Sequence, residues 1–361
     1  MLSTSIRNIF CLACLISFLS TAVVAQSYSS PESVEFDYAN NRWFISNNGN
    51  GQILTRNSAT GALAVFATGI PSGPHGLEIV GDTLYACDGS TLKAYEIQTA
   101  TLVFNINLGA SFLNGITHDN SGNLYITDFS TKRIYRFNTS NRTYSVFVSN
   151  TGSASPNGIV FDDANNRCVY VNWGSNAPIK AVDLSTGTVS TLATTNLGSC
   201  DGITKDNAGN YYVSSWSTTS KITRFNNDFT ASTAVVTTGL SNPADIFYNV
   251  LTDTLGVPNS GTGNNTAYYY FGSTTGLSNQ TQEPSPFHHQ LSHGSLIVRF
   301  NELTSAAWQL VNQHGQTVQS GIVGNDIGFT TSLSNLPNGN YLIRVQLGKQ
   351  FYTRSFVWIG Q

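Results

Sequence analysis

The stretch LNGITHDNSGNLYITD, residues 113–128, returns in altered form along the chain. It holds an apolar run with an Asn-Gly pair, then a polar turn, then a second run in which apolar and polar residues alternate. That is the pattern of two strands joined by a tight turn. Five other segments open in a similar way: PESVEFD (31–37), PHGLEI (74–79), PNGIVFD (156–162), CDGITKD (200–206) and PADIFYN (243–249).

The six repeats have a nearly constant length. In the third repeat, further strand-like runs cover residues 133–137 and, more weakly, 144–148. Four short strands in a repeat of about 40 residues are typical of a propeller blade. A solenoid of helix pairs has a similar period, but the many β-branched and aromatic residues of this chain exclude it. We therefore expect an all-β chain whose main part is a six-bladed β-propeller. Counted from Ser33, the equivalent positions follow at intervals of 43, 39, 43, 44 and 43 residues, at Gly76, Gly115, Gly158, Gly202 and Asp245.

Composition agrees with this prediction and narrows the classes of partner. Among 361 residues there are 32 glycines, 11% are aromatic and only 10% are charged, which suits strands and tight turns better than helices. The net charge is -3, so nothing favours a nucleic-acid partner or an anionic membrane.

The first residues predict a secretory signal peptide. Arg7 precedes an apolar run at residues 9–19, and small residues end at Ala25, so cleavage would leave Gln26 first. An uncleaved anchor is the alternative, but the run is short for a bilayer, and we expect no transmembrane segment in the mature chain. Three cysteines then remain, at unrelated spacings, so at most one disulfide can form. They are Cys87, Cys168 and Cys200.

The end of the chain lacks the repeat pattern. A polar segment with two prolines, residues 278–286, reads as a linker, and the sixth repeat before it has no clear fourth strand. Residues 26–30 are short for supplying that strand, so closure of the propeller is left open. Strand-like runs after the linker predict a small antiparallel β-sandwich. The expected organisation is a signal peptide (1–25), a propeller (26–277), a linker (278–286) and a C-terminal domain (287–361).

Two resemblances follow from these motifs. The repeat unit resembles NHL-type blades, and residues 31–276 resemble the gluconolactonase and regucalcin family of six-bladed propellers. The run WQLVNQHGQTV (308–318), with LPNGNYLIRV (336–345) and the final Phe356-Val357, resembles the sorting domain of the type IX secretion system of Bacteroidetes. The usual Tyr-Pro-Asn-Pro opening is absent. This resemblance implies the type IX machinery as a partner and export through the periplasm across the outer membrane, whereas the alternative is an ordinary binding sandwich.

Polar residues stand just before the predicted innermost strand of most blades, where they would converge on the propeller axis. Carboxylate and amide oxygens in a ring are ligands that suit Ca²⁺. In the resembled family a Glu in the first blade, an Asn in the fourth and an Asp in the fifth hold the catalytic metal. Glu32, Asn157 and Asp201 correspond to these residues, and Asn114 to a polar residue of the third blade that supports metal or substrate. We therefore expect Ca²⁺ or another divalent cation. The six residues of the ring are Glu32, His75, Asn114, Asn157, Asp201 and Ala244.

The resemblance implies a hydrolase in which the metal polarises a lactone or ester carbonyl and Asp201 or His75 assists a water. A structural interpretation of the same residues stays open, because Asn-Gly and Asp-Gly pairs also form turns. Trp173 and Trp216, at equivalent points of adjacent blades, would either cover a ligand or pack between blades. The sequence thus leaves enzymatic activity open. The alternative to a secreted Ca²⁺-dependent lactone or ester hydrolase is a non-catalytic extracellular propeller that binds a ligand or a protein.

Overall fold

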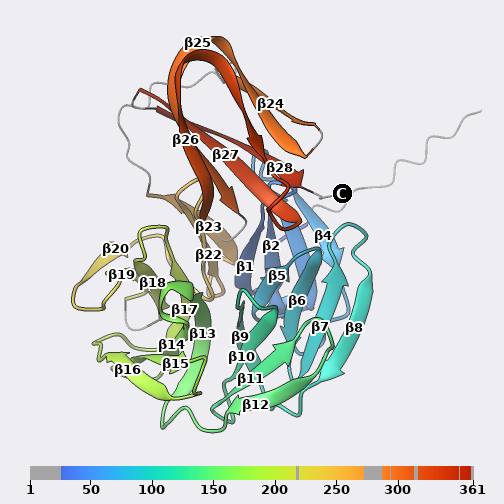
Figure 1. Ribbon diagram of the computed structural model, residues 1–361. Helices are drawn as coiled ribbons and strands as arrows, with labels where there is room; N and C mark the ends of the chain where they lie inside the picture. Colours follow the sequence, from blue (N-terminus) through green and yellow to red (C-terminus); the bar gives the residue numbers. More distant parts are fainter. Residues whose placement is uncertain are drawn as a thin grey trace, which may run out of the picture.

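Six antiparallel sheets surround a central axis in the computed structural model of the chain (Figure 1). The structure describes residues 26–216, 219–271, 287–292, 294–312, 316–348 and 350–358. The predicted signal peptide and linker lie outside these residues. Each sheet uses consecutive strands, so each repeat is one blade, and the predicted six-bladed propeller is confirmed.

The first five blades have four strands each, and the sixth has three among the described residues. The strands are β1 (Pro31–Asp37), β2 (Arg42–Asn47), β3 (Gln52–Asn57) and β4 (Leu63–Ala67); β5 (Leu77–Val80), β6 (Thr83–Asp88), β7 (Thr91–Glu96) and β8 (Leu102–Asn107); β9 (Leu113–His118), β10 (Asn123–Asp128), β11 (Arg133–Asn138) and β12 (Tyr144–Val148); β13 (Ser155–Asp162), β14 (Arg167–Trp173), β15 (Ile179–Asp183) and β16 (Val189–Ala193); β17 (Cys200–Lys205), β18 (Tyr211–Ser215), β19 (Lys221–Phe225) and β20 (Ser232–Val236); and β21 (Phe247–Asn249), β22 (Thr254–Asn259) and β23 (Asn265–Tyr270).

Glycines on the innermost strands let neighbouring blades touch backbone to backbone. A Cβ on Gly115 would lie 2.5 Å from the carbonyl oxygen of Asn157, and one on Gly158 would lie 2.6 Å from that of Asp201. Neither glycine has a positive φ, so space and not backbone conformation requires them. Because Asn114-Gly115 lies within β9 and Asn157-Gly158 within β13, the interpretation of these pairs as turn residues is wrong.

In blades 3 and 5, hydroxyl groups on the second strands tie the innermost strand to the next blade. The Thr127 hydroxyl accepts the N–H of Gly115 at 2.9 Å and donates to the carbonyl of Asn157, in the following blade, at 2.8 Å. Ser214 makes the corresponding pair of bonds two blades further on. These buried bonds satisfy backbone groups that the ladder leaves unpaired.

Replacing Thr127 by Val is therefore expected to lower the free energy of unfolding by about 2 kcal/mol, because it leaves a buried donor and a buried acceptor unpaired at constant side-chain size. Thr127→Ser, which keeps the hydroxyl, is the control. Denaturant unfolding of both variants measures the difference, and a Val variant at least as stable as the Ser variant would contradict the bonding role.

Apolar side chains fill the spaces between blades and between the first and last blade. Trp43 of β2 packs on Tyr268 of β23, with ring centroids 4.9 Å apart, and Gly256 of β22 leaves room for the indole. The Asp245 N–H donates to the carbonyl of Glu32 at 2.8 Å, and the Tyr28 hydroxyl accepts a bond from Thr266. The ring thus closes by contact of blade 6 with blade 1, without a described fourth strand in blade 6.

An ion-pair group joins blades 4 and 5. The carboxylate of Asp162 lies 2.7 Å from Nζ of Lys205 and 2.8 Å from Nε of Arg167. Burial opposes ionisation of Asp162, but hydrogen bonds from Lys205, Tyr211 and Asn165 outweigh it and lower its pKa to about 2. Since the unfolded carboxyl has an ordinary pKa, its ionised form stabilises the fold above about pH 4.

That stabilisation, about 2 kcal/mol at neutral pH, is expected to fade as the pH falls from about 4 to about 2. Denaturant unfolding of wild-type protein and Asp162→Asn at pH 5 and pH 2.5 isolates this carboxyl from the other acids. The stability gap between the two proteins should shrink to less than half at the lower pH, and a gap of equal size at both values would overturn the assignment.

The C-terminal domain is antiparallel β structure, with five strands in one hydrogen-bonded sheet. The long strands β25 and β26 pair along both halves, with their register interrupted between Arg299 and Thr304. β24 joins the first half of β25, and β27 with β28 joins the second. Side chains of both halves form one core that includes Val298, Leu310 and Ile343. The strands are β24 (Phe287–Ser292), β25 (Ser295–Asn312), β26 (Thr317–Ser332), β27 (Gly339–Leu347) and β28 (Gln350–Trp358).

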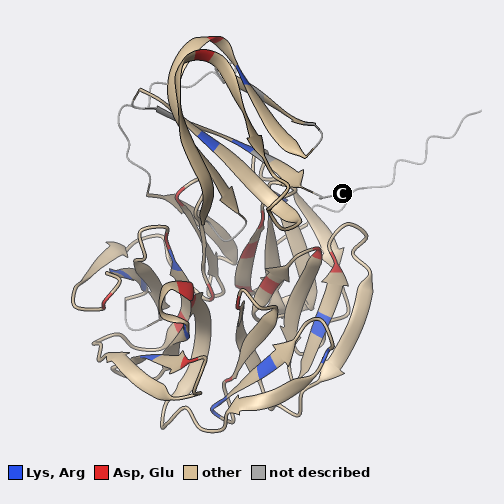
Figure 2. Cartoon of the chain, in the orientation of Figure 1, with Lys and Arg blue, Asp and Glu red and all other residues tan. Residues whose placement is uncertain are grey.

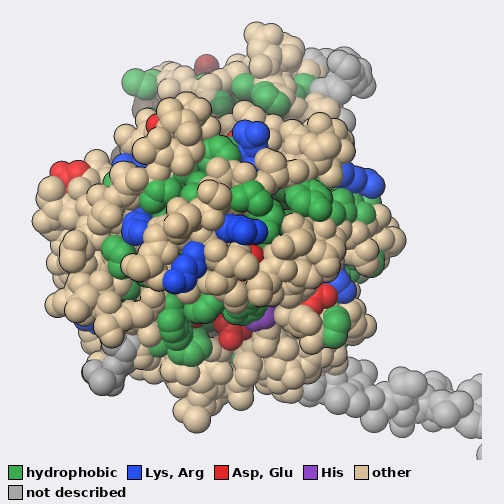
Figure 3. All heavy atoms as spheres, turned by 90° about the horizontal axis from the view of Figure 1, so that it is seen from below, with side chains coloured by type: hydrophobic (Ala, Val, Ile, Leu, Met, Phe, Trp, Pro, Cys, Tyr) green, Lys and Arg blue, Asp and Glu red, His purple; other side chains and the backbone are tan. Residues whose placement is uncertain are grey.

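Helical structure in the described residues is limited to two short 3₁₀ turns, η1 (Asn48–Asn50) and η2 (Asp163–Asn165). Within that part of the chain, no helix has the length and apolarity to cross a membrane. The three described cysteines are buried and free, so none forms a disulfide with another. Seen from below, the surface intersperses basic, acidic and hydrophobic side chains (Figure 3).

Candidate metal centre at the N-terminal mouth of the channel

Each predicted ligand sits in a β-bulge where its innermost strand begins; we call this end of the channel the N-terminal mouth. In blade 4 the ladder pairs Pro156 with Asn172 and then Ile159 with Tyr170, so Asn157 and Gly158 together oppose one residue. The same two-against-one arrangement holds Asn114 in blade 3 and Asp201 in blade 5, and Glu32 is the extra residue of blade 1. A bulge re-aims a side chain out of the regular ladder. The structure thus gives all four predicted ligands the same local setting.

Two carboxyl groups, those of the buried Asp201 and the half-buried Glu32, face unfavourable surroundings at this mouth. Asp201 is 5% exposed, and burial together with the negative charges of Glu32 and Asp245 raises its pKa well above the usual range. Burial also raises the pKa of Glu32 to about 7, although a hydrogen bond with Ser260 opposes the shift. Carboxylates that repel one another in a dry site are stabilised when a cation lies between them.

Asn157 adds an unused acceptor to this pair. Its side chain is 1% exposed, and its Nδ2 donates to the carbonyl of Cys200 at 3.3 Å. That bond fixes the amide, yet Oδ1 has no hydrogen-bond partner among the described residues. Buried acceptors are normally satisfied, so an unpartnered acceptor in the blade next to Asp201 points to a positive group that would bind there. Since no three described His, Cys, Asp or Glu side chains gather as a metal-binding group, a cation here would also need amide oxygens.

His75, the blade 2 member of the ring, is neutral at pH 7. Burial lowers its pKa to about 4, although the charge of Asp88 opposes the shift. Nε2 lies 3.1 Å from the Nδ2 donor of Asn48, which assigns the proton to Nδ1. That buried Nδ1 has no partner among the described residues. His75 therefore holds an unused N–H donor, which is a more specific role than the sequence indicated.

An arc of aromatic rings runs along the same mouth through four blades. The rings meet edge to face in the order His75–Phe112, Phe112–Phe129, Phe129–Trp173 and Trp173–Trp216, with centroids 4.6, 5.6, 6.1 and 5.0 Å apart. All five side chains are half-buried, and none belongs to a hydrophobic core cluster of the described residues. Trp173 and Trp216 therefore contact each other at the mouth and leave part of their surface open to a ligand.

The partners of the ring residues were not predicted from the sequence. Asn48 orients His75, Ser260 bonds to Glu32, and Asp245 adds a third carboxyl group in the channel. A signal existed for Asp245, since it stands where most other repeats have glycine. Figure 2 shows that several acidic residues lie along the innermost strands.

Comparison with known proteins agrees with the fold. No curated protein matches the chain. Among solved structures, a protein of unknown function from Bacteroides thetaiotaomicron has a TM-score of 0.60 at 12% identity, covering 68% of this chain and 70% of that one. A gluconolactonase from Xanthomonas campestris gives 0.55 at 14% identity, covering 64% and 84%. A calcium-binding regucalcin from Agrobacterium tumefaciens gives 0.52 at 18% identity, covering 65% and 83%. At these identities the likeness shows the fold alone.

Two family descriptions account for most of the chain. Residues 50–250 match the SMP-30/gluconolactonase/LRE-like region, and residues 290–359 match the secretion system C-terminal sorting domain. The first match spans Asn114, Asn157 and Asp201 and covers more than half of the chain. The second indicates export by type IX secretion, to the cell surface or the medium. The chain is thus a member of the SMP-30/gluconolactonase/LRE-like family, with a secretion sorting domain behind its propeller.

Proposed function

We propose that the protein is an exported hydrolase of lactones or esters that uses a divalent cation, most simply Ca²⁺, at the N-terminal mouth. Glu32, Asn157 and Asp201 would hold the cation, with Asn114 beside them. The observation that carries this proposal is the buried, unpartnered Oδ1 of Asn157, whose amide is held against the strand that carries Asp201. The pKa values of Asp201 and Glu32 at the same mouth are both raised. The family match and the calcium-binding regucalcin among the structural neighbours support the choice of metal.

The cation, when bound, would supply Lewis-acid polarisation of a carbonyl group. Residues of the chain would transfer the proton and orient the substrate. Asp201, a carboxylate at the metal centre, would take the proton of an attacking water. His75, with its proton on Nδ1, would donate a hydrogen bond to a substrate oxygen. The bond to Asn48 would hold the ring in that tautomer.

The aromatic arc indicates the class of substrate. Phe112, Phe129, Trp173 and Trp216 offer apolar, half-buried ring faces beside the polar ring. Such a wall favours a lactone or ester with an aromatic or apolar part over a small, highly hydrated one. The Trp216 indole is fixed by its bond to the carbonyl of Pro243 at 2.9 Å, so the wall is preorganised.

Hydrolysis of dihydrocoumarin and phenyl acetate by the purified full-length protein tests the proposal. Turnover should require Ca²⁺, vanish with a chelator and return when Ca²⁺ is restored. Glu32→Gln should lose most of the turnover, and Glu302→Gln, the same change at an exposed position, should keep it. Turnover that is indifferent to both chelator and Glu32→Gln would refute a metal-dependent hydrolase.

A non-catalytic role as a ligand-binding propeller is the second candidate. Ala244 of blade 6 contributes no polar side chain to the ring, so the ring is incomplete on one side. A protein that Ca²⁺ stabilises against heat, but that hydrolyses neither substrate, would favour this function, with the cation stiffening the channel.

A further inference from the structure

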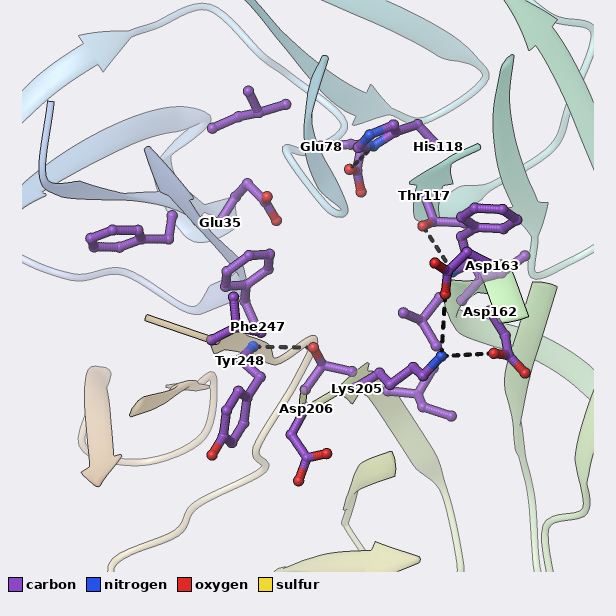
Figure 4. Close-up of a pocket in the computed structure, with 18 of the residues that line it drawn as sticks. Glu35, Glu78, Thr117, His118, Asp162, Asp163, Lys205, Asp206, Phe247 and Tyr248 are labelled. Carbon is purple, nitrogen blue, oxygen red and sulfur yellow. Dashed lines mark hydrogen bonds and ion pairs between the residues drawn. The ribbon is translucent and has the colours of Figure 1, made fainter. Parts of the chain in front are cut away.

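A large cavity occupies the opposite end of the channel, the C-terminal mouth, where the innermost strands end. Its volume is about 960 Å³, and Figure 4 shows residues that line it. Six aliphatic residues, one from each blade, line this cavity. They are Val34, Leu77, Ile116, Ile159, Ile203 and Ile246.

Glu35 is the distinctive residue of this cavity. It is 7% exposed and points into the hollow from β1, next to Glu78 on β5 (Figure 4). No described residue forms a hydrogen bond or an ion pair with its carboxylate. Burial, followed by the negative charges of Glu78 and Asp245, raises its pKa well above the usual range. An acid in such a place is costly to keep unless something satisfies it.

The cations around the cavity already have partners. Nζ of Lys205 lies 2.7 Å from Asp162 and 3.6 Å from Asp163, and Arg167 also pairs with Asp162. Nδ1 of His118 lies 2.5 Å from Oε1 of Glu78. The carboxyl group of Glu35 is therefore left for a group that enters from outside.

The walls limit what that group can be. Phe36, Ile79, Phe161 and Phe247 add apolar surface to the cavity. No three acidic or His side chains of the described residues gather to hold a metal ion, and the volume suits an organic molecule. An ammonium group offers three donors to a carboxylate and is held by charge-assisted hydrogen bonds.

We propose that the cavity at the C-terminal mouth binds a primary ammonium compound with an apolar body, and that Glu35 is the residue that anchors its ammonium group. The apolar body lies against the aromatic walls, and the positive charge stabilises the ionised carboxylate. This site is separate from the proposed metal centre and does not rest on it.

Calorimetric titration of the full-length protein with benzylammonium chloride tests the site. Wild-type protein should bind it, while benzyl alcohol, which has the same shape without the charge, should bind at least tenfold more weakly. Glu35→Gln should weaken benzylammonium binding by about tenfold to a hundredfold. This variant is expected to fold, because the carboxylate accepts no hydrogen bond that the amide would lose, and thermal melting checks it.

Two further variants locate the binding. Glu302→Gln removes a negative charge from an exposed position and should bind as wild type does. Asp201→Asn alters the other mouth and should also bind normally. Equal binding of benzyl alcohol and benzylammonium would overturn the proposal without any variant. Binding lost in Asp201→Asn but kept in Glu35→Gln would assign the ammonium group to the N-terminal mouth and would equally overturn it.

Discussion

Asp201→Asn is expected to lower the affinity for Ca²⁺ by at least about a hundredfold, or about 2.7 kcal/mol, and to abolish hydrolysis. The substitution keeps the size of the side chain and removes one of the two carboxylates on which a cation at this mouth depends. In the absence of Ca²⁺ the same change should raise the melting temperature by a few degrees, because it removes a buried acid that Glu32 and Asp245 repel. A substitution that lowers stability with Ca²⁺ but raises it without Ca²⁺ is characteristic of a binding-site residue that destabilises the empty fold.

Calorimetry and thermal melting, each with Ca²⁺ and with a chelator, measure both effects. Asp82→Asn is a matched control, since Asp82 is exposed and follows the C-terminal end of β5, at the mouth opposite the ring residues. Unchanged Ca²⁺ affinity in Asp201→Asn would remove Asp201 from the site. A fall in melting temperature under both conditions would instead make it a structural residue.

Gly158→Ala is expected to cost about 3 kcal/mol or more of folding free energy and to lower the melting temperature by roughly 10 °C. The added Cβ would stand 2.6 Å from the carbonyl oxygen of Asp201 and 2.7 Å from Cα of Gly202. Both are backbone atoms of the next blade, so no flexible side chain can move aside. Relief requires two innermost strands to separate, which also displaces the proposed ligands Asn157 and Asp201.

Gly324→Ala is the control for this prediction. A Cβ there meets nothing within 4 Å, and the φ of Gly324 is not positive. Its melting temperature should match that of the wild-type protein. If Gly158→Ala melted within a degree or two of wild type, the account of backbone contact between blades would be wrong.

The blades were predictable because each repeat carries its own two-strand pattern at a fixed period. The close backbone contact between the innermost strands of neighbouring blades was not predictable, because an Asn-Gly pair looks the same in a sequence whether it forms a turn or a bulge in a strand. What separates the two is the neighbouring blade, as in the contact of Gly158 with Asp201, and that contact joins residues 43 positions apart. The contact of Trp43 with Tyr268, which closes the ring between blades 1 and 6, could not be predicted for the same reason.

The candidate site was partly predictable. Glu32, Asn157 and Asp201 were predicted from their place just before each expected innermost strand. The structure puts each inside that strand, in a bulge, with Asn157 and Asp201 buried and Glu32 half-buried. Glu35 and Asp245 were not predicted, since their place in the channel depends on how six strands converge on one axis. The tautomer of His75 also needed the structure, because Asn48 sets it from the preceding blade.

An anomalous-scattering map from crystals grown with Ca²⁺, and again with Mn²⁺, tests the central claim most directly. The account predicts one strong peak at the N-terminal mouth, in contact with carboxylate oxygens of Glu32 and Asp201 and with Oδ1 of Asn157. A map with no peak among these three side chains, at metal concentrations well above those that support turnover or thermal stabilisation, would contradict it.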